Sequence, residues 1–140
     1  MAQVGTIIGV QKVLGNIVKR TRIMAAGTEQ GLKRAGLLLQ RESQMVVPVE
    51  FGVLKASAFT RAFGSGFKTT VTVGYTAAYA LYVHERVEMK WKGKPRMPNP
   101  PHKGKYWDPQ GRGQAKFLEE PARRLRKDMR AILLEHIKIV

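Results

Sequence analysis

Two runs of nine residues, KASAFTRAF at 55–63 and FKTTVTVGY at 67–75, lie on either side of Gly64, Ser65 and Gly66. Successive side chains of a strand point to opposite faces of a sheet. In the second run Phe67, Thr69, Val71, Val73 and Tyr75 are expected to point one way, and Lys68, Thr70 and Thr72 the other. We therefore predict a β-hairpin with a three-residue loop in which the glycines supply positive φ.

Apolar residues at helical spacing predict helices before the hairpin. Val10, Val13, Leu14, Ile17 and Val18 predict a helix from Val10 to Met24, after a short strand or extended arm at 4–10. Gly27 is then expected to stop this helix, and Thr28 to cap a second one that Pro48 ends after Val46. The second helix would bury Leu32, Ala35, Leu39, Ser43 and Val46, with Leu38 and Met45 beside them.

Two more helices are predicted after the hairpin. A short one covers 77–85, and a longer one has Pro121 in its first turn and Glu119 and Glu120 at its positive end. The core stripe of the longer helix is Ala122, Leu125, Met129, Ile132, Leu133 and Ile137, with Arg123, Lys127 and Arg130 opposite. The expected fold class is α+β, in which a small antiparallel sheet built on the hairpin packs against two or three α-helices.

Residues 86–114 show no periodicity and contain five prolines and four glycines. From Arg86 to Lys116 there are nine Lys and Arg residues against Glu88 and Asp108. Aperiodic segments of this length are usually functional or disordered. We predict a long basic loop in a single domain spanning 1–140, whose first 27 residues form an N-terminal arm and helix.

The whole chain is strongly basic, with 25 Lys and Arg against 10 Asp and Glu and a net charge of +15. Such a chain binds nucleic acid, acidic lipid or an acidic protein, and composition alone does not choose among them. The absence of cysteine excludes disulfides and thiol catalysis. The N-terminus lacks the pattern of a signal peptide and no apolar run approaches the length of a membrane span, so we expect a protein without a membrane partner.

Catalytic and metal-binding patterns are weak. A zinc-protease helix needs a second His four residues after His84, where the chain has Glu88. A partly buried structural role is expected for His84, and a salt bridge to a nearby cation such as Arg86 for Glu85. The Gly64–Gly66 turn precedes a strand, whereas a phosphate-binding loop precedes a helix. We therefore predict no catalytic residues, no metal and no cofactor, and a nuclease-like or toxin enzyme is the least favoured class.

Four motifs occur in an order that resembles the neck and minor tail components of tailed bacteriophages, the head-tail joining and tail-completion proteins of long-tailed phages. They are VPVEFGVLK at 47–55, the strand pair, YALYVHE at 79–85 and KFLE at 116–119. The similarity covers roughly residues 28–130. The chain departs from the family pattern at Phe51, often Thr, and at Arg86–Val87, where many members have Gly and a small residue.

The resemblance implies a virion protein, found in the host cytoplasm during assembly, that forms a ring between the head connector and the tail tube. It implies a homo-oligomer of six or twelve copies, with six preferred, and neighbours of the head-completion or connector type and of the tail terminator or tube type. Transient, non-specific contact with double-stranded DNA would accompany genome passage. A free-standing basic nucleic-acid-binding protein remains the alternative, because Trp91, Tyr106 and Trp107 stand among basic residues.

Two groups of residues follow as candidates. Subunit or partner contacts are expected from Glu85, Arg86, Lys90, Trp91, Lys92, Lys94, Arg96, Tyr106 and Trp107. Core or motif positions are expected at Pro48, Gly52, Leu54, Tyr79, Tyr82, Phe117 and Leu118, with the two tyrosines either in the core or at a subunit contact.

Overall fold

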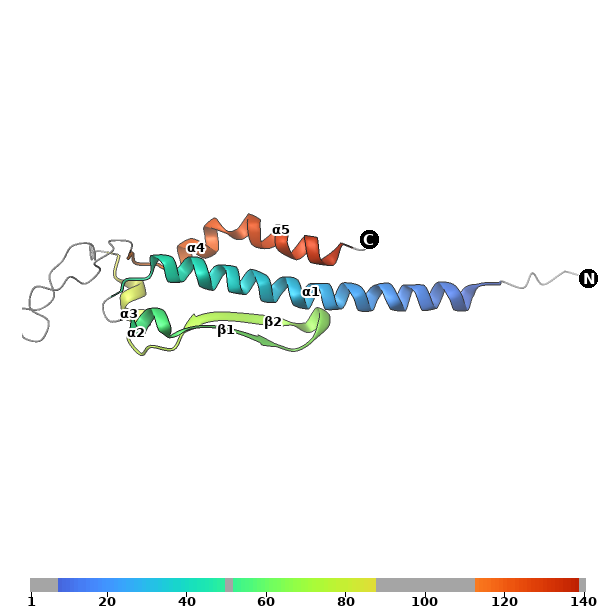
Figure 1. The fold of residues 1–140 in the computed structure, drawn as a ribbon, viewed down its shortest axis with the longest axis horizontal. Coiled ribbons are helices and arrows are strands. Elements are labelled where there is room, and N and C mark those ends of the chain that lie inside the picture. The colour runs from blue at the N-terminus through green and yellow to red at the C-terminus, as the bar shows by residue number, and fades with distance from the viewer. Residues whose placement is uncertain (1–7, 50–51, 88–112, 139–140) are drawn as a thin grey trace, which may run out of the picture.

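A computed structural model describes residues 8–49, 52–87 and 113–138. One long helix, α1 (Val10–Val46), is the axis of the molecule. The hairpin of β1 (Ala58–Phe63) and β2 (Thr70–Tyr75) packs on one side of it, and α4 (Glu119–Arg124) and α5 (Arg126–Ile137) pack on the other (Figure 1). Two short helices, α2 (Val53–Ala56) and α3 (Ala80–Glu85), lie near the C-terminal end of α1. The predicted α+β class is confirmed.

The predicted break at Gly27 and Thr28 is wrong, because α1 is continuous for 37 residues. The Thr28 hydroxyl donates to the carbonyl of Met24, 2.9 Å away, as an ordinary helix-interior threonine does. Gly27 serves packing instead: a Cβ at this position would lie 2.1 Å from the carbonyl oxygen of His136 in α5. The end of the helix was predicted correctly, since α1 stops at Val46 before Pro48.

The hairpin is confirmed, but its loop is longer than predicted. The strands pair antiparallel from Ala58 opposite Tyr75 to Phe63 opposite Thr70, which leaves 64–69 as the loop. Phe67 lies in the 3-10 turn η1 (Gly66–Lys68) because both the backbone N–H and the hydroxyl of Thr69 donate to the carbonyl of Gly66. Gly64 and Gly66 have φ of 79° and 55°, as the turn chemistry predicted.

The first predicted strand also begins later than expected, since the chain forms the helical turn α2 before Ala58. Gly52 starts that turn with φ of 82°, a left-handed conformation that favours glycine. The last predicted helix divides into α4 and α5 at the buried Leu125. Pro121 does lie in the first turn of α4, after Glu119 and Glu120.

The core lies at the C-terminal end of α1. Val47, Leu54, Ala80, Val83 and Phe117 form its buried cluster, with Leu118 partly buried against it. Phe117 is 1% exposed and meets the rings of Tyr75 and His84 edge-on, each at a centroid distance of 5.0 Å. The cluster therefore ties α1, the hairpin and α3 to the segment that leads into α4.

A buried polar contact supports the same end of the molecule. Ser43, which is fully buried, lies 2.6 Å from the hydroxyl of Tyr75. Burial raises the pKa of Tyr75, and the hydrogen bond to Ser43 opposes that shift. This serine thus has a structural partner that fixes β2 against α1.

Candidate assembly surfaces

The N-terminal part of α1 extends past both the hairpin and α5 (Figure 1). We call residues 10–24 the projecting segment. Its apolar stripe consists of Val10, Val13, Leu14, Ile17 and Val18, which are 45–57% exposed. Side chains of this kind normally face a core, because each Val, Leu or Ile gains about 1.5–3 kcal/mol on full burial. Nothing in the described part of the chain covers the stripe.

A second apolar surface lies on the body of the molecule. It is a groove with a volume of about 290 Å³ along α1, between β2 and α5. Its lining is Leu32, Ala35, Gly36 and Leu39 from α1, Val71 and Val73 from β2, and Met129, Arg130 and Leu133 from α5. Gly36 lets β2 approach α1 closely: a Cβ at this position would lie 2.6 Å from a methyl of Val71.

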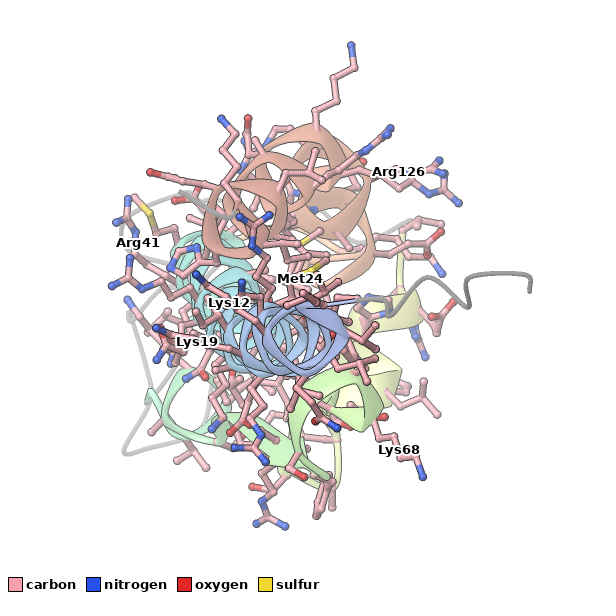
Figure 2. The ribbon with its side chains drawn as sticks, turned by 90° about the vertical axis from the view of Figure 1, so that its right-hand side faces the viewer. Lys12, Lys19, Met24, Arg41, Lys68 and Arg126 are labelled. Carbon is pink, nitrogen blue, oxygen red and sulfur yellow. The ribbon has the colours of Figure 1, made fainter. Side chains whose placement is uncertain are left out.

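The face of α1 opposite the stripe and the groove is basic. Lys12, Lys19 and Arg41 lie on the same side of the helix when the molecule is viewed along α1 (Figure 2). Lys12 and Lys19 make no ion pair with any described residue, whereas Arg41 lies 3.4 Å from Glu42. Exposed lysines that make no ion pair within the described residues are available to an external acidic partner.

A cluster of polar groups connects the residues that precede the segment 88–112 with those that follow it. The backbone N–H of Lys116 donates to the carbonyl of His84 at 2.8 Å, and the Lys116 ammonium donates to Glu85. His84 also contacts Glu85, with its Nδ1 at 2.8 Å from the carboxylate. The cluster fixes where the chain leaves α3 and where it returns before α4.

The ionisation of this cluster follows from its hydrogen bonds. Donation from Lys116, and then from His84, lowers the pKa of Glu85. The same bond to Glu85 raises the pKa of Lys116, which also interacts with Glu119. The predicted salt bridge of Glu85 is confirmed, with Lys116 as its cation. Arg86, the cation named as an example, lies instead over the ring of Tyr82, 4.2 Å from its centroid.

The other predicted contact residues fall into two groups. Lys90, Trp91, Lys92, Lys94, Arg96, Tyr106 and Trp107 lie outside the described residues. Tyr79 and Tyr82 are 46% and 56% exposed, so they are not core residues, and a subunit contact stays a prediction for them. His84 is partly buried, as expected for a structural histidine.

The apolar stripe had no functional role in the sequence prediction, although its residues were recognised as a helical set. The sequence indicated this contact surface only through an apolar stripe of two helical turns for which no packing segment was predicted. The described residues contain no group of three or more His, Asp or Glu placed to hold a metal ion. None of their helices has the length and hydropathy needed to cross a membrane.

Comparison with known proteins gives no relative: neither family models nor curated sequences nor solved structures match this chain.

Proposed function

We propose that this chain is a structural subunit of a tailed-bacteriophage neck, without catalytic activity, that joins the head connector to the tail. The observation that carries the proposal is the exposed apolar stripe of the projecting segment. A stable monomer rarely exposes a contiguous apolar surface, and such surfaces mark protein contacts. The order of the VPVEFGVLK, YALYVHE and KFLE motifs supports the neck as the place of that contact.

In the neck we propose a homo-oligomeric ring, with six copies preferred over twelve, through which the genome passes. A ring satisfies repeated contacts between identical subunits without leaving an open end. Its neighbours would be a connector or head-completion protein on one side and a tail terminator or tube protein on the other. Images of purified virions and of the assembled protein test the ring and its level in the neck.

The excess positive charge needs a partner in this proposal. Each phosphate contact adds affinity for DNA, and a strongly adhesive channel would slow the genome. We therefore assign most of the basic residues to acidic neighbouring rings and a minority to DNA. Replacing Lys90, Lys92 and Lys94 together with glutamine is expected to reduce the joining of heads to tails.

The measurement is the yield of infectious particles, with free heads and free tails counted by electron microscopy. Lys127→Gln, on the outer face of α5, serves as the control for loss of charge alone. Unchanged yield in the triple variant would contradict the assignment of these lysines.

A second function, non-specific nucleic-acid binding by the isolated protein, is favoured by the unpaired lysines of the basic face. It predicts binding to duplex DNA that is indifferent to sequence and falls steeply with salt. Titration with DNA at several salt concentrations tests it, and loss of binding near physiological salt would leave only the assembly role.

A further inference from the structure

We infer that the free protein is a two-fold dimer in which the apolar stripe of each copy lies in the groove of the other, with the two α1 helices antiparallel. The inference rests on the proposed function only in treating the stripe as a contact surface. Each chain carries two apolar surfaces, the stripe and the groove. In the dimer, each of them is covered by the other surface of a second copy of this chain.

The stripe and the groove lie on the same face of α1. An α-helix returns to the same direction after 18 residues, which is five turns of about 3.6 residues. Leu14 and Leu32 are separated by this interval, as are Ile17 and Ala35. One member of each pair belongs to the stripe and the other to the groove. The two surfaces therefore point in the same direction from different parts of one straight helix.

This shared direction selects the arrangement of the two copies. When the partner's stripe lies in the first copy's groove, the partner's own groove also faces the first copy, because the stripe and the groove share one side of α1. When the partner runs antiparallel, its groove then meets the first copy's stripe, and both surfaces are covered at once. Such a contact is isologous, and it closes after two copies.

The lengths of the two parts agree with this arrangement. The projecting segment spans 15 residues, or about 22 Å of helix. The body begins just beyond it on both sides of α1: the hairpin loop reaches Ala25 through Gly66, and the end of α5 reaches Gly27 through His136. A two-fold axis near Ala25 and Ala26 places each projecting segment beside the partner's body. The two hairpins then lie end to end on one side of the helix pair, and the two α5 helices lie end to end on the other.

Charge opposes an arrangement in which the two projecting segments lie side by side. The first 28 residues contain four Lys and Arg and no acidic residue, so two such segments would repel. Residues 29–140 are also net basic, with 21 Lys and Arg against 10 Asp and Glu, so charge can help the antiparallel pair only through local ion pairs. An axis between 25 and 26 brings Arg22 level with the partner's Glu29, on the same edge of the helix. Arg130, at the rim of the groove, is exposed and can turn to solvent.

The two stripes supply most of the buried area. Five half-exposed Val, Leu and Ile side chains present roughly 450 Å² per stripe, so the two stripes give on the order of 900 Å². The apolar residues of the groove are already buried or partly buried and add less, which brings the pair to the low end of the range of about 1,200–2,000 Å² for stable interfaces. Closure of the dimer occupies the stripes, so free protein does not polymerise, and the stripes become available to the neck when the pair opens.

Engineered cysteines test the pairing directly, because the chain has no cysteine of its own. Ile17 and the partner's Ala35 are expected to lie within disulfide range, which requires Cα atoms about 4.4–6.8 Å apart. Ile17→Cys mixed with Ala35→Cys should therefore form a disulfide dimer under mild oxidation, whereas each variant alone should not. A single chain carrying both changes should give a doubly linked dimer and no larger product.

The mass in solution gives an independent measurement on the uncrosslinked protein. Light scattering should report twice the chain mass of 15.7 kDa. Ile17→Asp should weaken the dimer by at least about 100-fold, since it places a charge in an apolar contact. Lys19→Asp, on the opposite face of α1, should leave the dimer unchanged. Circular dichroism checks that both variants keep their helices.

A monomer at high concentration, or a ladder of crosslinked products from the double-cysteine chain, would overturn the two-fold pair. A ladder would indicate a head-to-tail contact instead. These outcomes are separate from the fate of the neck proposal, which depends on head-tail joining in infected cells. A protein that dimerises as described but is dispensable for infectious particles would retain the dimer and lose the neck.

Discussion

Replacing Gly27 with alanine is expected to destabilise the protein, although the same change in an open stretch of α1 is expected to stabilise it. Alanine favours a helix over glycine by about 1 kcal/mol. At Gly27 the added methyl would lie 2.1 Å from the His136 carbonyl oxygen, a backbone atom that moves only if α5 shifts or its last turn unwinds. Overpacking of this kind costs about 1–3 kcal/mol.

The control is Gly15→Ala, because no described atom outside the neighbouring backbone of α1 lies within 4 Å of a Cβ at that position. Gly15→Ala should raise the free energy of unfolding by about 0.5–1 kcal/mol. For Gly27→Ala the gain in helix propensity is subtracted from the cost of overpacking, and the free energy of unfolding should fall by up to about 2 kcal/mol. Urea unfolding followed by circular dichroism measures both. Equal stabilisation by the two variants would refute the close packing of α5 on α1.

Two further predictions concern the core and the polar cluster. Phe117→Ala should cost about 3–5 kcal/mol in urea unfolding, since it removes a fully packed ring; Phe67→Ala, whose ring is 56% exposed, should change stability by no more than about 0.5 kcal/mol. The pKa of Glu85 lies below its ordinary value of 4.5 in the folded protein, so Glu85 stabilises the fold above that pH and loses this contribution as the pH falls through the folded pKa. Glu85→Gln should therefore lessen the fall in Tm below about pH 4.5, and an identical acid profile for both proteins would count against the bond to Lys116.

The elements that sequence predicted well are those whose pattern has one physical meaning. Alternation at Val71, Val73 and Tyr75 fits only a strand, and Pro48 excludes continuation of α1. Gly27 has two possible meanings in sequence, a helix stop or a site of close packing. The choice depends on His136, more than a hundred residues later, so local pattern could not decide it.

Other differences have the same origin in contacts between distant residues. The division of the last helix at Leu125 has no glycine or proline to announce it. The partner of Glu85 is Lys116, 31 residues along the chain, and sequence favoured the adjacent Arg86. The candidate surfaces were partly visible, because helical spacing identified the apolar stripe. Its exposure became evident only when the hairpin and α5 were seen to end near Ala25 and Gly27.

The continuity of α1 also has a mechanical consequence. A helix of 37 residues is about 55 Å long. It connects the exposed valines and leucines near its start with the packed cluster around Phe117 near its end, and it has no joint between them. Molecules bound at the two ends are thus held a fixed distance apart, and a displacement at one end is transmitted to the other as by a stiff rod.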